Sequence, residues 1–518
     1  MPVGISWSQL DCATLAAAGL VALCLNRYVA SRRPYASLPL PPGPKSSWLG
    51  KVSLPQTYQW LTYAEWRQTY GDLIYIYIFG NPILVLNSAK AASDLLEKRG
   101  SNYSSRPIRT MVVELIGWDW LFSAMHYGNR WKRHRNLFHA HFRPSDTAVY
   151  HSLQTRETHT LLRNLLAHPD DFRYNIRRLA AAVILNVTYG HQVAEGGDEY
   201  VALADRALSS LAKAGIYGTY IVDYIPMLKH LPAWLPFASF KRQAYEWRKS
   251  VRDMVNRPFE MIKDQMQEGT AAPCFVAQEL EKRATGSDFE DEDIIKNVAA
   301  TAYAAGSDTF VSAVLSFFLV ALLYPDVQKK AQEELDRVIG GRLPHFDDRT
   351  QLPFIESLCY ELLRWNPVTP MGLAHYAAED DEYCGYRIPK GTTVLPNVWA
   401  ILHDPEVYPD PLIFNPSRFV DREGNSAAGI NVLPDVAFGF GRRMCPGRWF
   451  AFDIMWIVVA SVLSVYDISK ATDENGEVVE PVVEYTSHLL SHPKPFKCRI
   501  APRSPSARLL VEQTVLES

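Results

Sequence analysis

The spacing of apolar residues predicts a mostly helical protein. Helical periodicity dominates from about residue 88 to 365, which indicates a long α-helical body. Two short apolar runs, Leu73–Phe79 and Ile83–Leu86, predict strands joined by a turn. A hairpin-like strand pair is predicted around Tyr386–Leu395, and a further strand segment near Val482–Ile500. The expected fold is mostly α with small β-sheets, in a single large domain.

One predicted helix, over Ile294–Leu323, carries an unusual interruption. From Val298 to Leu323 it is apolar almost all round, interrupted by Thr301 and by Gly306-Ser307-Asp308-Thr309. A second transmembrane span would show the same apolar pattern, but a carboxylate in the middle of a span is costly in lipid. The central buried helix of a large helical protein is therefore the favoured interpretation. Four helix-unfriendly residues in a row predict a local distortion that holds water or a ligand.

The N-terminus has a different pattern from the rest of the chain. An apolar run of 14 residues, Cys12–Leu25, is followed by arginines and by the proline-rich segment Leu38–Pro44. The run is shorter than the roughly 20 residues that span a bilayer, and a cleaved signal peptide is the alternative. Because the basic residues follow the run, we expect an uncleaved membrane anchor over residues 1–30. A basic, proline-rich linker over 31–50 and a body over 51–518 then follow.

Composition and charge exclude several classes of protein. Hydrophobic residues make up 47% and charged residues 21% of the chain, which is typical of a globular protein. The 53 basic and 56 acidic residues nearly balance, so we expect no nucleic-acid partner. The seven cysteines are widely scattered and form no CxxC pair. This argues against a disulfide framework and against a structural zinc site.

One cysteine, Cys445, has unusual neighbours in the stretch FGFGRRMCPG (Phe438–Gly447). A long apolar helix is predicted directly after it, over Arg448–Tyr466, and a helix N-terminus favours a thiolate. Glycines let the backbone approach a flat partner closely, and Arg442 and Arg443 suit carboxylates. A flat, carboxylate-bearing partner whose metal takes a thiolate describes haem.

Two other interpretations of this cysteine loop are possible. A Rossmann-type phosphate loop needs a third glycine where Met444 stands, and it needs a preceding strand that the pattern does not predict. A nucleophilic cysteine would need a base, and the sequence places no histidine for that purpose. This second test is weak, so a nucleophilic role for Cys445 stays open at this point.

Glu361 and Arg364 stand three residues apart in YELLRW, on one face of a predicted helix. An ordinary surface ion pair would contribute about 0–1 kcal/mol. The apolar neighbours Leu362, Leu363 and Trp365 favour a buried pair instead. A buried arginine usually needs further acceptors.

These motifs together resemble a known family. Phe438-x-x-Gly441-x-Arg443-x-Cys445-x-Gly447 resembles the cysteine-ligand signature of the cytochrome P-450 haem-thiolate monooxygenases. Four further segments stand in the family's order: Trp131–Arg135 (WxxxR), Ala305–Thr309 (the oxygen-activating segment), Glu361–Arg364 (ExxR) and Asn415–Phe419 (PxRF). The resemblance covers essentially the whole chain and is greatest to microsomal fungal members of secondary metabolism. Phe310 and Ser417 depart from the residues that are common in the family.

The resemblance implies a role for each matching residue. Cys445 is expected to be the axial thiolate ligand of heme b, in a loop with Phe438, Gly441 and Gly447. Asp308 and Thr309 are expected to relay protons to bound dioxygen. The haem propionates are expected to contact Trp131, Arg135, Arg443 and, as a further candidate, His375. The residues expected to brace the fold are Glu361, Arg364 and Arg418.

The resemblance also implies the partners. The substrates would be O2 and a hydrophobic small molecule such as a terpenoid, polyketide or aromatic compound. Because the chain has no flavin domain, electrons would come from a separate NADPH-cytochrome P-450 reductase. A single-pass anchor in membrane lipid, that of the endoplasmic reticulum, would leave the haem domain in the cytosol. The expected substrate contacts are Ile108–Phe122, Tyr303, Ala304, Val368–Leu373, Leu489 and Leu490.

Two alternative functions remain. A haem-thiolate isomerase or dehydratase uses a peroxide and needs no reductase, but such enzymes can dispense with the acid–threonine pair. The intact Asp308-Thr309 pair argues against this alternative. The other is a non-catalytic haem-binding membrane protein.

Overall fold

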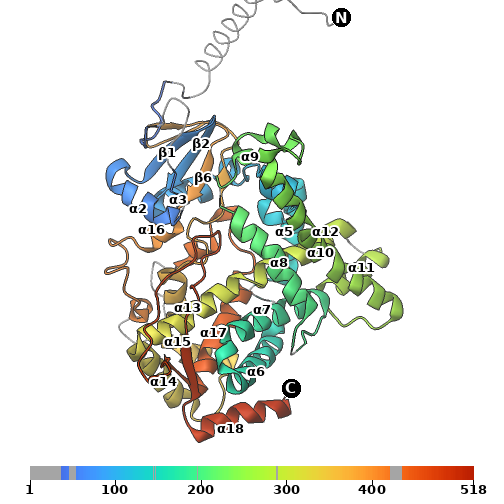
Figure 1. The fold of residues 1–518 in the computed structure, drawn as a ribbon, viewed down its shortest axis with the longest axis vertical. Helices are drawn as coiled ribbons and strands as arrows, with labels where there is room; N and C mark the ends of the chain where they lie inside the picture. The colour runs from blue at the N-terminus through green and yellow to red at the C-terminus, as the bar shows by residue number, and fades with distance from the viewer. Residues whose placement is uncertain are drawn as a thin grey trace, which may run out of the picture.

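The structure is a computed structural model. It describes residues 35, 37–45, 54–55, 57–143, 145, 147–194, 196–216, 218–286, 290–420 and 434–517. The predicted membrane anchor and half of the predicted linker lie outside the described residues. The described part is mostly helical with small sheets, which confirms the predicted fold class. Figure 1 shows the helices gathered in one body, with the largest sheet at the end where the chain's early residues lie.

The helices of the body lie between residues 59 and 513. The four shortest are α3 (Ala89–Ala92), α4 (Gly100–Tyr103), α9 (Ile221–Tyr224) and α16 (Val398–Leu402). The longer ones are α2 (Gln59–Tyr70), α5 (Asn129–His141), α6 (His151–Ala167), α7 (Phe172–Tyr189), α8 (Glu199–Ala214), α10 (Ser239–Glu268), α11 (Phe275–Ala284), α12 (Glu292–Gly306), α13 (Thr309–Leu323), α14 (Pro325–Ile339), α15 (Pro353–Trp365), α17 (Arg448–Val465) and α18 (Pro505–Gln513).

The largest sheet has the strand order β1-β2-β6-β3. The predicted early strands form it with β1 (Leu73–Ile78) and β2 (Asn81–Leu86), an antiparallel hairpin in which Leu73 pairs with Leu86. Strand β6 (Thr393–Pro396) is fully buried and runs parallel to β2, with β3 (His375–Tyr376) on its other side. Two smaller sheets pair β4 (Asp381–Tyr383) with β5 (Tyr386–Ile388), and β7 (Tyr466–Lys470) with β8 (Cys498–Pro502).

The hairpin predicted around Tyr386–Leu395 is wrong, because its two strands belong to different sheets. Cys384 and Gly385 both have left-handed backbone conformations, with φ of 53° and 79°. This tight turn folds β5 back on β4, while the apolar β6 is drawn into the interior beside β2. The strand predicted over Val482–Ile500 is present only at its end, where β8 begins at Cys498.

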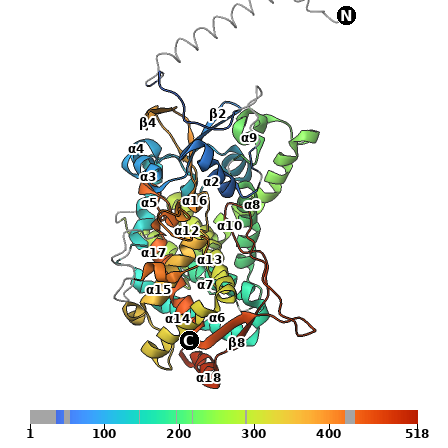
Figure 2. The ribbon, with the colours of Figure 1, turned by 90° about the vertical axis from the view of Figure 1, so that its left-hand side faces the viewer.

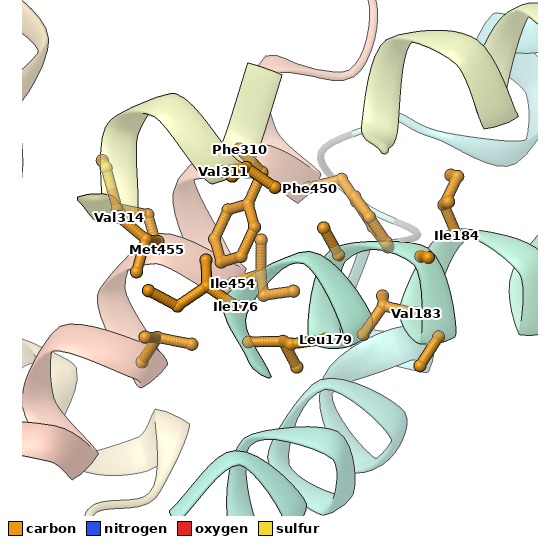
Figure 3. Close-up of a cluster of buried hydrophobic side chains, with 14 of the residues drawn as sticks. Ile176, Leu179, Val183, Ile184, Phe310, Val311, Val314, Phe450, Ile454 and Met455 are labelled. Carbon is orange, nitrogen blue, oxygen red and sulfur yellow. The ribbon is translucent and has the colours of Figure 1, made fainter. Parts of the chain in front are cut away.

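The core joins three helices that are far apart in the sequence. Figure 3 shows side chains of α7, α13 and α17 in one cluster, with Phe310 pointing toward Ile176 and Ile454. Phe310, a departure from the family pattern, is therefore a core residue. Two stretches, Glu292–Leu323 and Arg448–Val465, are apolar and long enough to span a membrane, but 78% of each apolar window is buried. Such burial is typical of core helices, as predicted for the first stretch.

The distortion predicted in the central helix is present. Helix α12 ends at Gly306 and α13 begins at Thr309, with Asp308 at φ −131° and ψ −34° between them. A Cβ atom on Gly306 would lie 2.8 Å from Cγ1 of Ile184 on α7. The two helices therefore pack too closely here for any side chain at position 306.

Part of the predicted linker is bound to the body. The Tyr75 amide donates a hydrogen bond to the Pro42 carbonyl (2.8 Å), and the Arg387 amide donates to the Pro39 carbonyl (2.8 Å). A Cβ on Gly43 would lie 1.9 Å from the Tyr75 carbonyl oxygen, so only glycine fits there. The described part of the proline-rich segment thus lies along β1 rather than free of the domain.

Candidate active site

Cys445 lies in a turn that precedes α17. Its backbone N–H donates to the Phe438 carbonyl (2.8 Å), which closes the loop, and Phe438 is a partly buried residue that packs against the core. The segment before this loop, Pro434–Phe438, is a 3-10 turn rather than a strand. A Rossmann-type phosphate loop follows a strand, so the phosphate-loop interpretation is excluded here.

The thiol of Cys445 is half-buried and free. Burial raises its pKa, while a hydrogen bond from the Gly447 amide and the charges of Arg135 and Arg448 act in the opposite direction. A raised pKa keeps the sulfur protonated until a metal displaces the proton. A free nucleophile needs a lowered pKa, which these surroundings do not give Cys445.

The loop glycines Gly441 and Gly447 differ in their surroundings. Gly441 has φ of +51°, and a Cβ there would lie 2.5 Å from the Leu96 carbonyl oxygen. The backbone at Gly441 therefore packs closely against the π-helical turn Ser93–Lys98. A Cβ on Gly447 would make only ordinary contact with Phe138, at 3.8 Å. The structure thus gives Gly441 a packing reason that the sequence motif does not reveal.

Arg443 connects the cysteine loop to α5. Its Nε donates to the Ser104 carbonyl (2.6 Å) and its Nη2 to the Met125 carbonyl (2.7 Å). The guanidinium lies 4.3 Å from the centre of the Trp131 ring, a cation–π contact. Nη1 is buried and has no partner among the described residues. The structure therefore brings together Trp131 and Arg443, which the sequence assigned to one function.

Arg106 lies in the same region, and the sequence analysis missed it. Its guanidinium is buried and donates to the carbonyls of Ser123 (3.0 Å), Leu373 (2.9 Å) and Ala374 (2.8 Å). Burial lowers the pKa of Arg106 to about 9, and burial with the charge of Arg106 lowers the pKa of Arg443 to about 8. Because a guanidinium stays protonated, these lowered values express the cost of burying unpaired cations.

His375 and Arg135 extend this group of basic residues. His375 on β3 is buried, and its Nδ1 donates to the Tyr103 carbonyl (2.8 Å), which leaves Nε2 for another partner. Burial lowers its pKa well below the usual value, and the charges of Arg106 and Arg443 add to this. Arg135 is one turn after Trp131 on α5, and burial lowers its pKa too.

We call Arg106, Arg135, Arg443 and His375 the basic cluster. In the described part of the chain, none of its members has a hydrogen bond or ion pair with a carboxylate. Buried charges are normally paired, so the cluster lacks an anion. A ligand that carries two carboxylates and binds beside the Cys445 thiol would supply the missing anion. The residues present therefore fit haem, which carries two propionates.

The interrupted central helix, made of α12 and α13, is called the distal helix below. It presents one accessible face at the break. Ala305 is exposed and Thr309 is half-exposed although most of their neighbours are buried. The Thr309 hydroxyl donates to the Ala305 carbonyl (2.7 Å), so its lone pairs stay free to accept. Tyr303 lies elsewhere: its side chain is fully buried and donates to the Tyr200 carbonyl. The expected substrate contact at Tyr303 is therefore a core residue.

Asp308 is nearly buried between two basic side chains. Its Oδ1 lies 3.4 Å from Nη1 of Arg177, and its Oδ2 lies 3.3 Å from Nε2 of His492. Burial by itself would raise its pKa, but His492 and Arg177 lower the pKa below the ordinary value. Asp308 and Thr309 are adjacent at the break, and the carboxylate is held on the side of α7.

The Glu361–Arg364 pair is fully buried, as the apolar neighbours predicted. Arg364 on α15 donates from Nε to Oε2 (2.6 Å) and from Nη2 to Oε1 (2.7 Å) of Glu361. It also donates to the carbonyls of Leu402 (3.1 Å) and Pro411 (2.8 Å). Nε of Arg418 lies 3.4 Å from Glu361 Oε1. These three residues hold the segment that precedes the cysteine loop against α15.

Known proteins place the chain in a family. The cytochrome P450 family model matches residues 41–500. A cytochrome P450 monooxygenase of Armillaria gallica is 43% identical over 514 residues, which cover 97% of this chain and all of that protein. Cytochrome P450 monooxygenase 208 of Postia placenta is 43% identical over 96% of both chains, and cytochrome P450 monooxygenase ple1 of Rhodocybe pseudopiperita is 39% identical over 91% of both.

The chain belongs to the cytochrome P450 family. It is a P450-type monooxygenase, and the cofactor of its family is haem with a cysteine thiolate as axial ligand. The resemblance drawn from the sequence motifs is thereby confirmed, including its fungal character, since these relatives are fungal proteins.

The buried ion pair predicts a large effect of one substitution. Glu361→Gln leaves Arg364 charged and without its anion, so we expect the free energy of unfolding to fall by about 3–5 kcal/mol. Chemical denaturation measures this loss. The control is Glu512→Gln in the exposed Arg508–Glu512 pair, which we expect to cost less than about 1 kcal/mol. Equal losses in the two variants would contradict the buried role of Glu361.

Acid sensitivity is predicted at His403, next to this pair. Burial and the charge of Arg364 lower the pKa of His403 to about 3. Below pH 6.5 the unfolded chain therefore takes up a proton that the folded chain does not, and stability falls between pH 6.5 and 3. We expect His403→Gln to flatten this fall in pH-dependent denaturation, whereas the exposed His139→Gln leaves it unchanged. An unaltered pH dependence in His403→Gln would refute the prediction.

Proposed function

We propose that this protein is a membrane-anchored monooxygenase that oxidises a hydrophobic small molecule with O2 and electrons from a separate NADPH-cytochrome P-450 reductase. Cys445 is the axial ligand of its haem. One observation carries this proposal: a half-buried, free thiol lies beside a basic cluster that lacks an anion. Family membership makes haem the cofactor, and the cluster supports this loop as its site.

Four basic residues and one aromatic residue would hold the propionates. Nη1 of Arg443 is a buried donor that has no partner among the described residues. His375 lies in the same cluster, with its Nδ1–H already donated to the Tyr103 carbonyl. Arg106 and Arg135 add charge, and Trp131 stacks on Arg443 and fixes its orientation. When bound, the haem iron binds and activates dioxygen, with electron density from the thiolate. Binding would also remove the energetic cost of the unpaired cations.

Thr309 and Asp308 would deliver protons. The Thr309 hydroxyl already donates to Ala305, so it can accept a hydrogen bond from a water and orient that water on the accessible face. Asp308 is adjacent and can pass a proton to such a water. The lowered pKa of Asp308 means that its carboxyl needs a proton source of its own. Glu361, Arg364 and Arg418 act only in bracing the fold.

The substrate is proposed to be a hydrophobic small molecule such as a terpenoid, polyketide or aromatic compound of secondary metabolism. The loop Ile108–Phe122 reaches the distal helix, where the Phe122 amide donates to the Thr301 hydroxyl (3.4 Å). The turn at Leu489 packs against Gly215 at the end of α8. Apolar side chains dominate the loop, and the turn contributes Leu489 and Leu490. Apolar pockets select apolar ligands.

Membrane attachment is supported by the exposed surface of the body. Large apolar side chains follow α9 and are mostly exposed: Met227 (76%), Trp234 (78%) and Phe237 (70%). Such exposed apolar residues are typical of a membrane contact. Figures 1 and 2 show α9 at the same end of the molecule as the described start of the chain. A single-pass anchor in the endoplasmic reticulum would hold this end at the bilayer, with the haem domain in the cytosol.

The reductase is proposed to dock on the exposed surface formed by the cysteine loop and α5. Arg442 in the loop and Lys132 on α5 are exposed basic side chains, whereas the exposed Arg133 is paired with Glu290 and Asp291. Positive patches of this kind steer acidic partners. A peroxide-dependent isomerase would need no such surface, and a non-catalytic carrier would need neither this surface nor Thr309.

Turnover with purified reductase tests the proposal. We expect product only with NADPH, reductase and O2 present. In Thr309→Ala, haem content should be unchanged, while product formed per NADPH consumed should fall about tenfold or more because water at the site is no longer oriented. Thr309→Ser keeps the hydroxyl and is the matched control. Turnover with peroxide alone would favour the isomerase, and full coupling in Thr309→Ala would refute the relay.

A further inference from the structure

A histidine from the C-terminal part of the chain lies against the distal acid. Nε2 of His492 is 3.3 Å from Oδ2 of Asp308, although 184 residues separate the two in sequence. The His492 amide donates to the Thr486 hydroxyl (3.0 Å), and the neighbouring Ser491 carbonyl accepts from the Ser312 hydroxyl on α13 (2.5 Å). His492 is therefore fixed to the helix that begins at the break.

The charged groups around this pair determine which of them can supply protons. Arg177 on α7 contacts Asp308 and also pairs with Asp205 on α8 at 2.7 Å. A guanidinium keeps its proton at all ordinary pH values. Asp308 itself is held ionised by its two neighbours, with a lowered pKa. The other titratable or charged groups near His492 are His488, which itself interacts with Lys213, and Arg173, which donates to the Pro493 carbonyl.

Of the groups that touch Asp308, only an imidazole changes charge near neutral pH. The second ring nitrogen of His492, Nδ1, is buried and has no hydrogen-bond partner among the described residues. Nothing in the described protein therefore fixes whether Nδ1 carries a proton. A buried polar atom without a partner calls for an explanation, and a catalytic role or a bound water are two of those available. His492 can thus change its protonation state without breaking another hydrogen bond.

We propose that His492 is a positioning residue that orients Asp308 and supplies it with protons from solvent. This inference rests on the proposed function. One solvent proton, passed on by a water bound at the buried Nδ1 that has no protein partner, converts the neutral imidazole to imidazolium. Nε2 then gives a proton to Oδ2 of Asp308, and the imidazole is neutral again. The carboxylic acid passes this proton to the water that Thr309 orients, so one solvent proton is delivered in each passage and only N–H and O–H bonds change.

The first test compares two histidine variants in reductase-driven turnover. His492→Gln keeps an N–H donor for Asp308 but cannot exchange a proton. We expect its haem content to match the wild type and its product per NADPH to fall about tenfold. In the wild type, this coupling should decrease as pH rises, because the imidazolium is lost; in His492→Gln it should be low and independent of pH. His139→Gln, which changes an exposed histidine on α5 outside this group of residues, is the control and should behave like the wild type.

The second test does not depend on turnover. In the full-length chain labelled with 15N-histidine, the ring signal missing from His492→Gln belongs to His492. Its ring signal should move in Asp308→Asn at a fixed pH, because the carboxylate that Nε2 contacts is removed. An unmoved signal, or wild-type coupling and pH dependence in His492→Gln, overturns the inference. Absence of reductase-driven product in the wild type overturns the proposed function instead, and the ring signal still decides the pairing.

Discussion

Unpaired positive charge buried beside a thiol is the constraint on which the site depends. Arg443 donates two hydrogen bonds to backbone carbonyls and stacks on the Trp131 ring. Its Nη1 has no partner among the described residues. Arg106 is a second buried cation, and the hydrogen bonds that it donates go to backbone carbonyls. A protein bears this cost when a ligand supplies the missing anion. The basic cluster is thus the physical observation that best supports the proposed haem site beside Cys445.

The core couples this proximal side to the distal helix. Phe310 follows Thr309 directly and packs with Ile454 of α17, the helix that begins three residues after Cys445. Gly306 allows α7 to approach within contact of the break. The position of the thiol and the position of the relay are therefore set by one cluster of apolar side chains. The Asp308 carboxylate lies outside that apolar cluster and contacts Arg177 and His492. Arg177 in turn pairs with Asp205 on α8, and His492 belongs to the C-terminal segment.

Features with a local chemical cause could be predicted from the sequence. The helix break follows from four consecutive residues, and the buried Glu361–Arg364 pair follows from its apolar neighbours. Contacts between distant segments could not be predicted. Arg106 has no local pattern that distinguishes it from a surface arginine, and the direction of Tyr303 depends on where α8 packs. The hairpin predicted around Tyr386–Leu395 is wrong because β6 pairs with β2, which lies over 300 residues earlier in the chain.

The direct test of the central claim is the spectrum of the reduced protein with carbon monoxide. The account predicts the strongly red-shifted band of thiolate-ligated haem in the wild type and in Cys384→Ser, which removes an exposed cysteine far from the site in sequence. Cys445→Ser should lose that band. The same band in Cys445→Ser would contradict the assignment of Cys445 as the iron ligand, and with it the site described above.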